Sequence, residues 1–148
     1  MFKHEEINGN GRCPTYLHRW TLFQPRMPKW FWRGFGIYLH KFVGDDWSLD
    51  LHDHPKRFWS IGLRGRYIEH RADGTTVTYR APWIRSFPAE HRHRLTGPTP
   101  NDPCWTLVVV GAPVRDWGFW HFERFIPWRH YVAPGSPEAA VSTSCVDK

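Results

Sequence analysis

The chain has 148 residues, of which 41% are hydrophobic and 23% are charged, and its formal net charge is +6. This length suits one compact domain, because domains usually have about 100–200 residues. The apolar fraction excludes a disordered acidic chain, and no run approaches the roughly 18–20 apolar residues of a membrane span. The start, MFKHEEINGNGR, lacks the apolar centre of a secretory signal, so we expect a cytoplasmic protein without membrane contact.

Ten Trp, ten Phe and five Tyr residues are many for a chain of this size, and they must fill a core, line a pocket or form a binding surface. The positive charge favours anionic partners, but neither a basic run nor a nucleic-acid motif accompanies it. A nucleic-acid partner is therefore only weakly indicated. The cysteines Cys13, Cys104 and Cys145 are too few and too scattered for a disulfide framework, so we expect reduced thiols.

Short apolar or aromatic runs of about 5–8 residues, separated by Gly, Pro, Asn and Asp, predict an antiparallel all-β domain with almost no helix. The expected strands are 16–22, 36–42, 47–52, 58–63, 66–70, 76–80, 83–87, 92–96, 105–111 and 118–125. Asp73 and Gly74 tolerate positive φ and mark the best hairpin turn. We expect one barrel over about residues 16–125 within a single domain, 1–132, and a flexible tail over 133–148. The expected core draws on Trp20, Trp59, Trp83, Trp105 and Leu107.

Residues with metal-binding chemistry concentrate in two segments. In the run LHDHP (51–55), His52 and His54 alternate, so both would point to the same face of a strand. In the run PAEHRH (88–93), His93 lies at the start of the expected strand 92–96. Two imidazoles on one face can bind one metal ion, and a small β-barrel can bring such segments together. A His-x-His pair is also common at a solvated strand end, so the pair alone leaves both interpretations open.

The spacing of these residues resembles the motifs of the cupin superfamily of RmlC-like jelly rolls. His52-x-His54, followed after three residues by Phe58 and after six more by Gly65, resembles the first motif, with Phe58 where glutamate is usual. The run FPAEHRHR (87–94) resembles the second motif, with His93 at its histidine position. The likeness covers about residues 36–111, and the motif sequences are similar to those of small uncharacterised cupin-like proteins of bacteria and phages.

The resemblance implies an antiparallel double-stranded β-helix, the cupin jelly-roll barrel, in which His52, His54 and His93 hold one divalent metal ion. Three neutral imidazoles without a carboxylate suit iron, zinc, copper or nickel, and manganese is a further candidate. A fourth ligand could come from His40. If residues 44–47 turn a hairpin between the strands 36–42 and 47–52, the residue opposite His40 in the strand register is within one position of the metal pair.

Alternation from these histidines places further side chains around the ion. Glu90 and His91 could act as ligand, outer partner or acid–base group, and His91 fits a neighbour better than a ligand because the spacing from Pro88 to His93 matches the motif. The expected pocket lining consists of Tyr38, Phe58, Ser60, Glu90 and His91, with Glu90 and Tyr38 as catalytic candidates.

Three functions remain open at this point. The preferred one is a metal-dependent enzyme, in which the ion activates dioxygen or polarises a substrate oxygen of a small molecule, and the positive charge favours an anion. The alternative is a cupin-shaped binding or scaffold protein for a small molecule, a nucleic acid or a protein. A further alternative is a metal-free sugar-nucleotide epimerase, with His54 or His93 as base and Tyr38 or Tyr67 as acid. A homodimer is compatible with all three.

Overall fold

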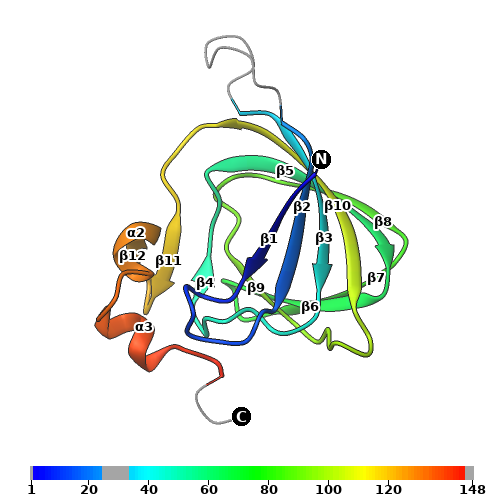
Figure 1. Cartoon of the computed structure of the whole chain (residues 1–148). Coiled ribbons are helices and arrows are strands. Elements are labelled where there is room, and N and C mark those ends of the chain that lie inside the picture. Colours follow the sequence, from blue (N-terminus) through cyan, green and yellow to red (C-terminus); the bar gives the residue numbers. More distant parts are fainter. Residues whose placement is uncertain (1, 25–33, 146–148) are drawn as a thin grey trace.

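The computed structural model describes residues 2–24 and 34–145, and two antiparallel six-stranded sheets enclose a barrel in this part of the chain (Figure 1). The first sheet contains, in spatial order, β1 (Lys3–Ile7), β2 (Leu17–Phe23), β3 (Gly36–Phe42), β10 (Cys104–Pro113), β5 (Lys56–Arg64) and β8 (Trp83–Phe87). The second contains β12 (Arg124–Pro127), β11 (Gly118–His121), β4 (Leu51–His52), β9 (His93–Thr96), β6 (Arg66–Arg71) and β7 (Thr76–Arg80). The described residues also form α2 (Trp128–Tyr131) and α3 (Pro137–Val141), neither of which has the length and apolarity to cross a membrane.

The all-β prediction is confirmed, and three strands, β3, β7 and β8, begin and end where the sequence predicts. The predicted hairpin at Asp73 and Gly74 also forms, joining β6 to β7 with Gly74 at a φ of 80°. Other boundaries differ. The strand expected over 118–125 is divided into β11 and β12 by Phe122 and Glu123, whose φ angles are 45° and 64°. The strand β1 was not predicted.

The hairpin expected between residues 36–42 and 47–52 is wrong. The strand β3 pairs with β2 and β10 in the first sheet, whereas the strand that remains of 47–52, β4, pairs with β11 and β9 in the second. The chain therefore changes sheet at Gly44–Asp46 instead of turning back. This difference decides which side chains face each other inside the barrel.

The main core fills the barrel between the two sheets. Its buried members are Leu17, Phe42, Phe58, Tyr67, Tyr79, Trp83, Phe87, Leu95 and Cys104. Gly62 is needed in this core because a Cβ at that position would overlap the indole ring of Trp83. Aromatic rings therefore make up most of this core.

Of the five residues expected in the core, Trp83 alone is buried. The strand β10 does not lie buried on both faces, because Thr106 faces the barrel and the alternate residues Trp105 and Leu107 lie on the outer face of the first sheet. There the rings of Trp20 and Trp105 stack with centroids 5.8 Å apart, and Trp59 is 49% exposed. The prediction placed the apolar residues Trp105 and Leu107 in the core, but the outer face on which they lie is only partly covered.

The segment expected to be a loose tail packs onto the barrel as far as residue 145. A second core holds the C-terminal helices, and its buried members are Trp47, Phe119, Ile126, Tyr131 and Ala139. A disulfide joins Cys13 to Cys145, so the expectation of reduced thiols is wrong for these two cysteines and holds for the buried Cys104. These contacts tie the N-terminal segment and the C-terminal helices to one side of the barrel.

Candidate metal centre

Two neighbouring strands of the second sheet bring the three predicted histidines together. His52 at the end of β4 lies directly opposite His93 at the start of β9. His54 follows two residues later, and its backbone N donates a hydrogen bond to the carbonyl of Ala89 at 3.0 Å. Between them, Asp53 points the other way and accepts a hydrogen bond from the backbone N of Gly118 at 2.9 Å. The alternation expected from the sequence is therefore present.

The three imidazole rings converge at one point inside the barrel. Their centroids lie 5.1 Å apart for His52 and His54, and 4.9 Å apart for each of the two pairs that involve His93. One ring nitrogen from each histidine lies within 4.8 Å of the others, and Nε2 of His54 is 3.0 Å from Nε2 of His93. This separation is that of a hydrogen bond between two imidazoles, and it is also the separation of two neighbouring ligands about 2.0–2.1 Å from one ion.

All three imidazoles are held neutral. Burial lowers the pKa of His52, His54 and His93. For His52 and His54 the neighbouring rings lower it further because a second positive charge would be repelled, whereas for His93 the hydrogen bond to Glu69 opposes the effect of burial without cancelling it. A neutral imidazole offers a lone pair without first losing a proton, which is the form that binds a metal ion. The donor set fits a divalent ion.

Glu69 of β6 holds His93 from behind. It is 1% exposed, and its Oε1 accepts hydrogen bonds from His93 Nδ1 at 2.8 Å and His91 Nε2 at 2.5 Å, while Oε2 accepts one from Arg71 Nε at 2.8 Å. Burial by itself raises the pKa of this carboxyl, but the three hydrogen bonds outweigh it and hold the pKa below its usual value. An ionised carboxylate only accepts, so His93 carries its proton on Nδ1 and presents the Nε2 lone pair to the site.

A second buried carboxyl lies beside His52. Asp46 Oδ2 is 3.7 Å from His52 Nδ1 and accepts a hydrogen bond from the backbone N of Leu95 at 2.8 Å. Burial raises the pKa of Asp46 to about 7. The sequence analysis did not identify Asp46 or Glu69 as site residues. The available signal for Glu69 was its alternation with Tyr67 on an expected strand, which places both on one face.

Two further predicted residues lie beside the histidines. The Phe58 ring is 4.5 Å from the His54 ring by centroids and only 8% exposed, so a phenyl group occupies the side of the site where the cupin motif carries glutamate. His91 contacts the site through Glu69, and its ring lies 5.1 Å from that of His93. Glu69, His91 and His93 form a second group of three donors that could hold a metal ion.

Three other predicted site residues have different surroundings. Glu90 is exposed and does not line the barrel. Ser60 is buried in the aromatic core, where its Oγ accepts a hydrogen bond from Trp83 Nε1 at 3.2 Å. His40 lies on the opposite sheet, and its Nε2 accepts a hydrogen bond from Arg19 Nε at 3.1 Å. The expectation of His40 as a fourth ligand rested on the hairpin that does not form.

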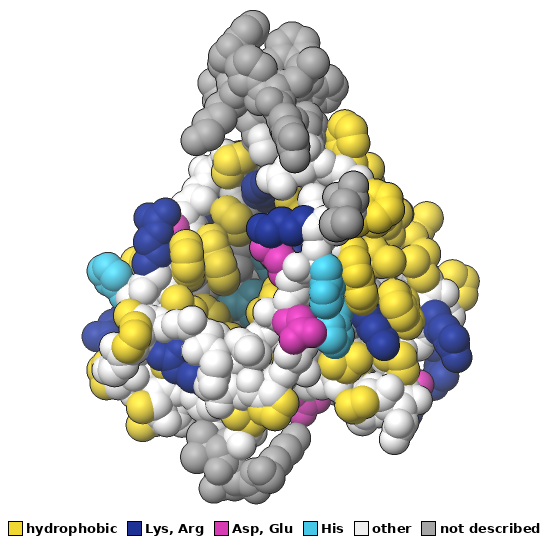
Figure 2. Space-filling model, in the orientation of Figure 1, with side chains coloured by type: hydrophobic (Ala, Val, Ile, Leu, Met, Phe, Trp, Pro, Cys, Tyr) yellow, Lys and Arg dark blue, Asp and Glu magenta, His cyan; other side chains and the backbone are white. Residues whose placement is uncertain are grey.

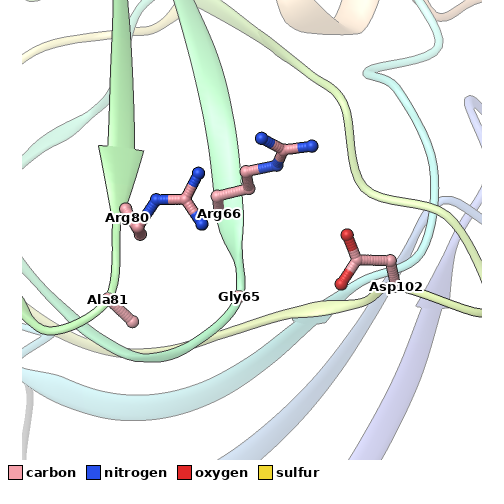
Figure 3. A pocket seen from close by; sticks show the side chains of 5 residues that line it. All are labelled: Gly65, Arg66, Arg80, Ala81 and Asp102. Atoms are coloured by element: carbon pink, nitrogen blue, oxygen red, sulfur yellow. The ribbon is translucent and has the colours of Figure 1, made fainter.

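A hollow opens on the face of the molecule drawn in Figure 2, with histidine on its floor and both hydrophobic and charged side chains around it. A separate depression, lined by Gly65, Arg66, Arg80, Ala81 and Asp102, contains no histidine (Figure 3). On the outer surface, His4, Glu6 and His18 also bring potential ligand atoms together, with His4 Nε2 3.2 Å from His18 Nδ1. His4 lies on the strand β1 and His18 on the neighbouring strand β2.

Comparison with solved structures identifies the fold. A cupin-2 domain, Rru_A2000 from Rhodospirillum rubrum, matches with a TM-score of 0.58 and 14% identity over 78% of this chain and 73% of that one. The chain has the cupin fold. The polyketide cyclase RemF from Streptomyces resistomycificus matches this cupin barrel over 93% of the chain and 92% of RemF, with a TM-score of 0.62 and 17% identity.

A third cupin match is the iron(II) form of HppE, with a TM-score of 0.52 and 9% identity over 73% of this chain and 56% of HppE. The chain also spans about half (51%) of a DMSP lyase chain that it matches with a TM-score of 0.51. No family model matches the sequence, and no curated protein does. These identities are low, so the comparisons establish the double-stranded β-helix and no activity.

Proposed function

We propose that this cupin is a metal-dependent enzyme in which His52, His54 and His93 hold one divalent ion. The observation that carries the proposal is the convergence of three neutral imidazoles on one point of the barrel, with the Nε2 lone pair of His93 set by Glu69. A core histidine that serves packing alone does not need two further imidazoles at this distance. Iron, zinc, nickel or manganese suits the donors, and the iron in HppE supports iron.

With three neutral ligands the ion keeps its full double charge, so it would polarise a substrate oxygen or activate dioxygen. The protein side chains supply the surroundings. Phe58 excludes water beside His54, because its ring packs at 4.5 Å between the centroids. Glu69 keeps the proton of His93 on Nδ1. The substrate that fits this positively charged centre is a small anionic molecule.

Metal analysis of protein purified without a histidine tag tests the proposal. We expect about one ion per chain, and loss of most of it in His52→Ala, His54→Ala and His93→Ala, with the barrel still folded because its apolar core does not include the ion. The matched control is His130→Ala, which removes an exposed imidazole that belongs to none of the donor groups and should leave the metal content unchanged. Full occupancy in His93→Ala would refute the proposed site.

The same measurement distinguishes the two donor groups. If the ion lies among His52, His54 and His93, His91→Ala weakens binding without abolishing it. If the ion instead lies among Glu69, His91 and His93, His91→Ala abolishes binding and His52→Ala does not. These opposite patterns identify the site without a structure of the loaded protein.

A coordination position open to substrate separates an enzyme from a non-catalytic binding protein. Azide should change the visible absorption of the cobalt(II)-loaded protein if such a position exists, and an unchanged spectrum would favour the binding protein. The epimerase alternative loses one of its two candidate acids, because Tyr67 is 4% exposed and packs 5.1 Å from the Trp83 ring by centroids.

A further inference from the structure

A row of polar side chains crosses the inner face of the first sheet. Arg19 of β2 pairs in register with His40 of β3, and His40 pairs with Thr106 of β10. Because side chains alternate along a strand, Arg19 and His40 share the inward face with the core residues Leu17 and Phe42. The metal-site histidines come from the second sheet, so this polar row lies on the opposite wall of the barrel.

The guanidinium group of Arg19 is held in place by neighbouring side chains through only some of its hydrogen-bond donors. Its Nε donates to His40 Nε2 at 3.1 Å, and its Cζ lies 5.6 Å from the centre of the Tyr38 ring. His40 can accept this bond because burial, and then the charge of Arg19, keep its pKa well below the usual value. These contacts orient the planar fork, and among the described residues its two terminal nitrogens form no hydrogen bond, so they can donate to a ligand.

Arg19 has no counter-ion in the described part of the chain. None of the ion pairs formed there involves it. The interior carboxylate of Glu69 is already occupied by Arg71 and two histidines. A partly enclosed cation without a partner is unfavourable unless a ligand supplies the negative charge.

Thr106 adds an independent observation on the same row. It is 1% exposed, and its Oγ1 has no hydrogen-bond partner among the described residues. Buried hydroxyl groups are nearly always paired, so this hydroxyl is available to a bound molecule. It is two strands from Arg19, roughly 10 Å across the sheet, which a ligand of several atoms can span.

We propose that Arg19, positioned by His40, binds the carboxylate of a small organic acid inside the barrel, and that the Thr106 hydroxyl donates a hydrogen bond to the same molecule. The planar fork of one arginine matches a carboxylate in geometry and in charge. That the acid is the substrate, with its reacting oxygen at the metal, rests on the proposed function. The carboxylate site itself does not require the ion.

Calorimetric titration with succinate tests this inference on zinc-loaded protein. Arg19→Gln should weaken succinate binding at least tenfold, and Thr106→Val should weaken it by a smaller factor. The matched control is Arg57→Gln, which removes the same charge from an exposed position on β5 and should change binding less than twofold. Arg19→Lys keeps the charge without the fork and should restore part of the affinity.

The outcomes separate this inference from the metal proposal. Succinate binding that is equal in Arg19→Gln and the unaltered protein, with both folded, overturns the inference even if the histidines hold an ion. An equal loss in Arg57→Gln also overturns it, because the effect then comes from net charge alone. If the protein takes up no metal but Arg19→Gln still lowers succinate affinity, the carboxylate site stands and the proposed metal function fails.

Discussion

Replacing Glu69 with Gln keeps the shape of the side chain and removes the charge that orients His93. In the structure this carboxylate accepts hydrogen bonds from three donors, on His93, His91 and Arg71. A glutamine amide offers one acceptor oxygen and one donor group in their place. Either Arg71 or the two histidines must then face an N–H group, so the proton on His93 Nδ1 loses its partner or its orientation.

The size of the effect follows from the role of Glu69 as an outer partner of a metal ligand. Loss of such a partner weakens metal binding by roughly 10–100-fold. Since each factor of ten corresponds to about 1.4 kcal/mol, the expected loss of binding free energy is about 1.4–2.8 kcal/mol. The metal-free protein should also lose about 1–3 kcal/mol of unfolding free energy, because a buried donor is left without a proper acceptor.

Competition with a coloured chelator at pH 7 measures this affinity. Glu90→Gln is the matched control, since it makes the same chemical change at an exposed residue outside the barrel, and it should alter the dissociation constant less than twofold. Unchanged metal affinity in Glu69→Gln would refute the reasoning, because it would mean that His93 does not depend on Glu69. Complete loss of binding would instead identify Glu69 as a direct ligand.

Three other predictions use different observations. Hydrogen bonds hold the pKa of Glu69 below its usual 4.5, so its ionised form stabilises the fold above pH 4.5, and this contribution falls as the pH falls. In urea titrations, the difference in unfolding free energy between the unaltered protein and Glu69→Gln should therefore shrink below pH 4.5. Phe58→Glu should place a carboxylate beside His54 and shift metal preference toward iron(II) or manganese(II) in competition assays, and unchanged preference would contradict the position of Phe58. Cys13→Ser should lower the unfolding free energy by about 2–5 kcal/mol, and a reducing agent should have this effect on the unaltered protein but none on the variant.

The sequence was most informative where local alternation decides the result. The positions of His52 and His54 on one face, and of Asp53 on the other, follow from the period of a strand and hold in the structure. The approach of His93 was implied by resemblance to the cupin motifs. Which strands pair is set by contacts between distant segments, and for this reason the placement of His40 failed.

The residues that the sequence analysis missed have a common physical origin. Glu69 appears in the sequence as one more polar residue on a short strand, and its interior position depends on donors that come from β9 and from its own strand. Arg19 likewise has no motif, and its inward position became visible only once β2 was paired with β3. Polar residues inside a barrel are identified by the residues that they hydrogen-bond or pair with, and a single sequence does not show which distant residues these are.

The distribution of charge inside the barrel connects the two proposals. Two buried carboxyl groups lie near the histidines: Glu69 is held behind His93 by three donors, and burial raises the pKa of Asp46 to about 7, so neither offers a fully ionised, unengaged carboxylate to an ion bound by the histidines. Phe58 occupies the side beside His54 and supplies no negative charge there. An ion at this site would therefore keep its full charge and would face the uncompensated cation Arg19 on the opposite wall. Since two unneutralised cations in one enclosed space are unfavourable, the bound molecule has to bring the negative charge, and a carboxylic acid meets that requirement with the group that Arg19 is shaped to bind.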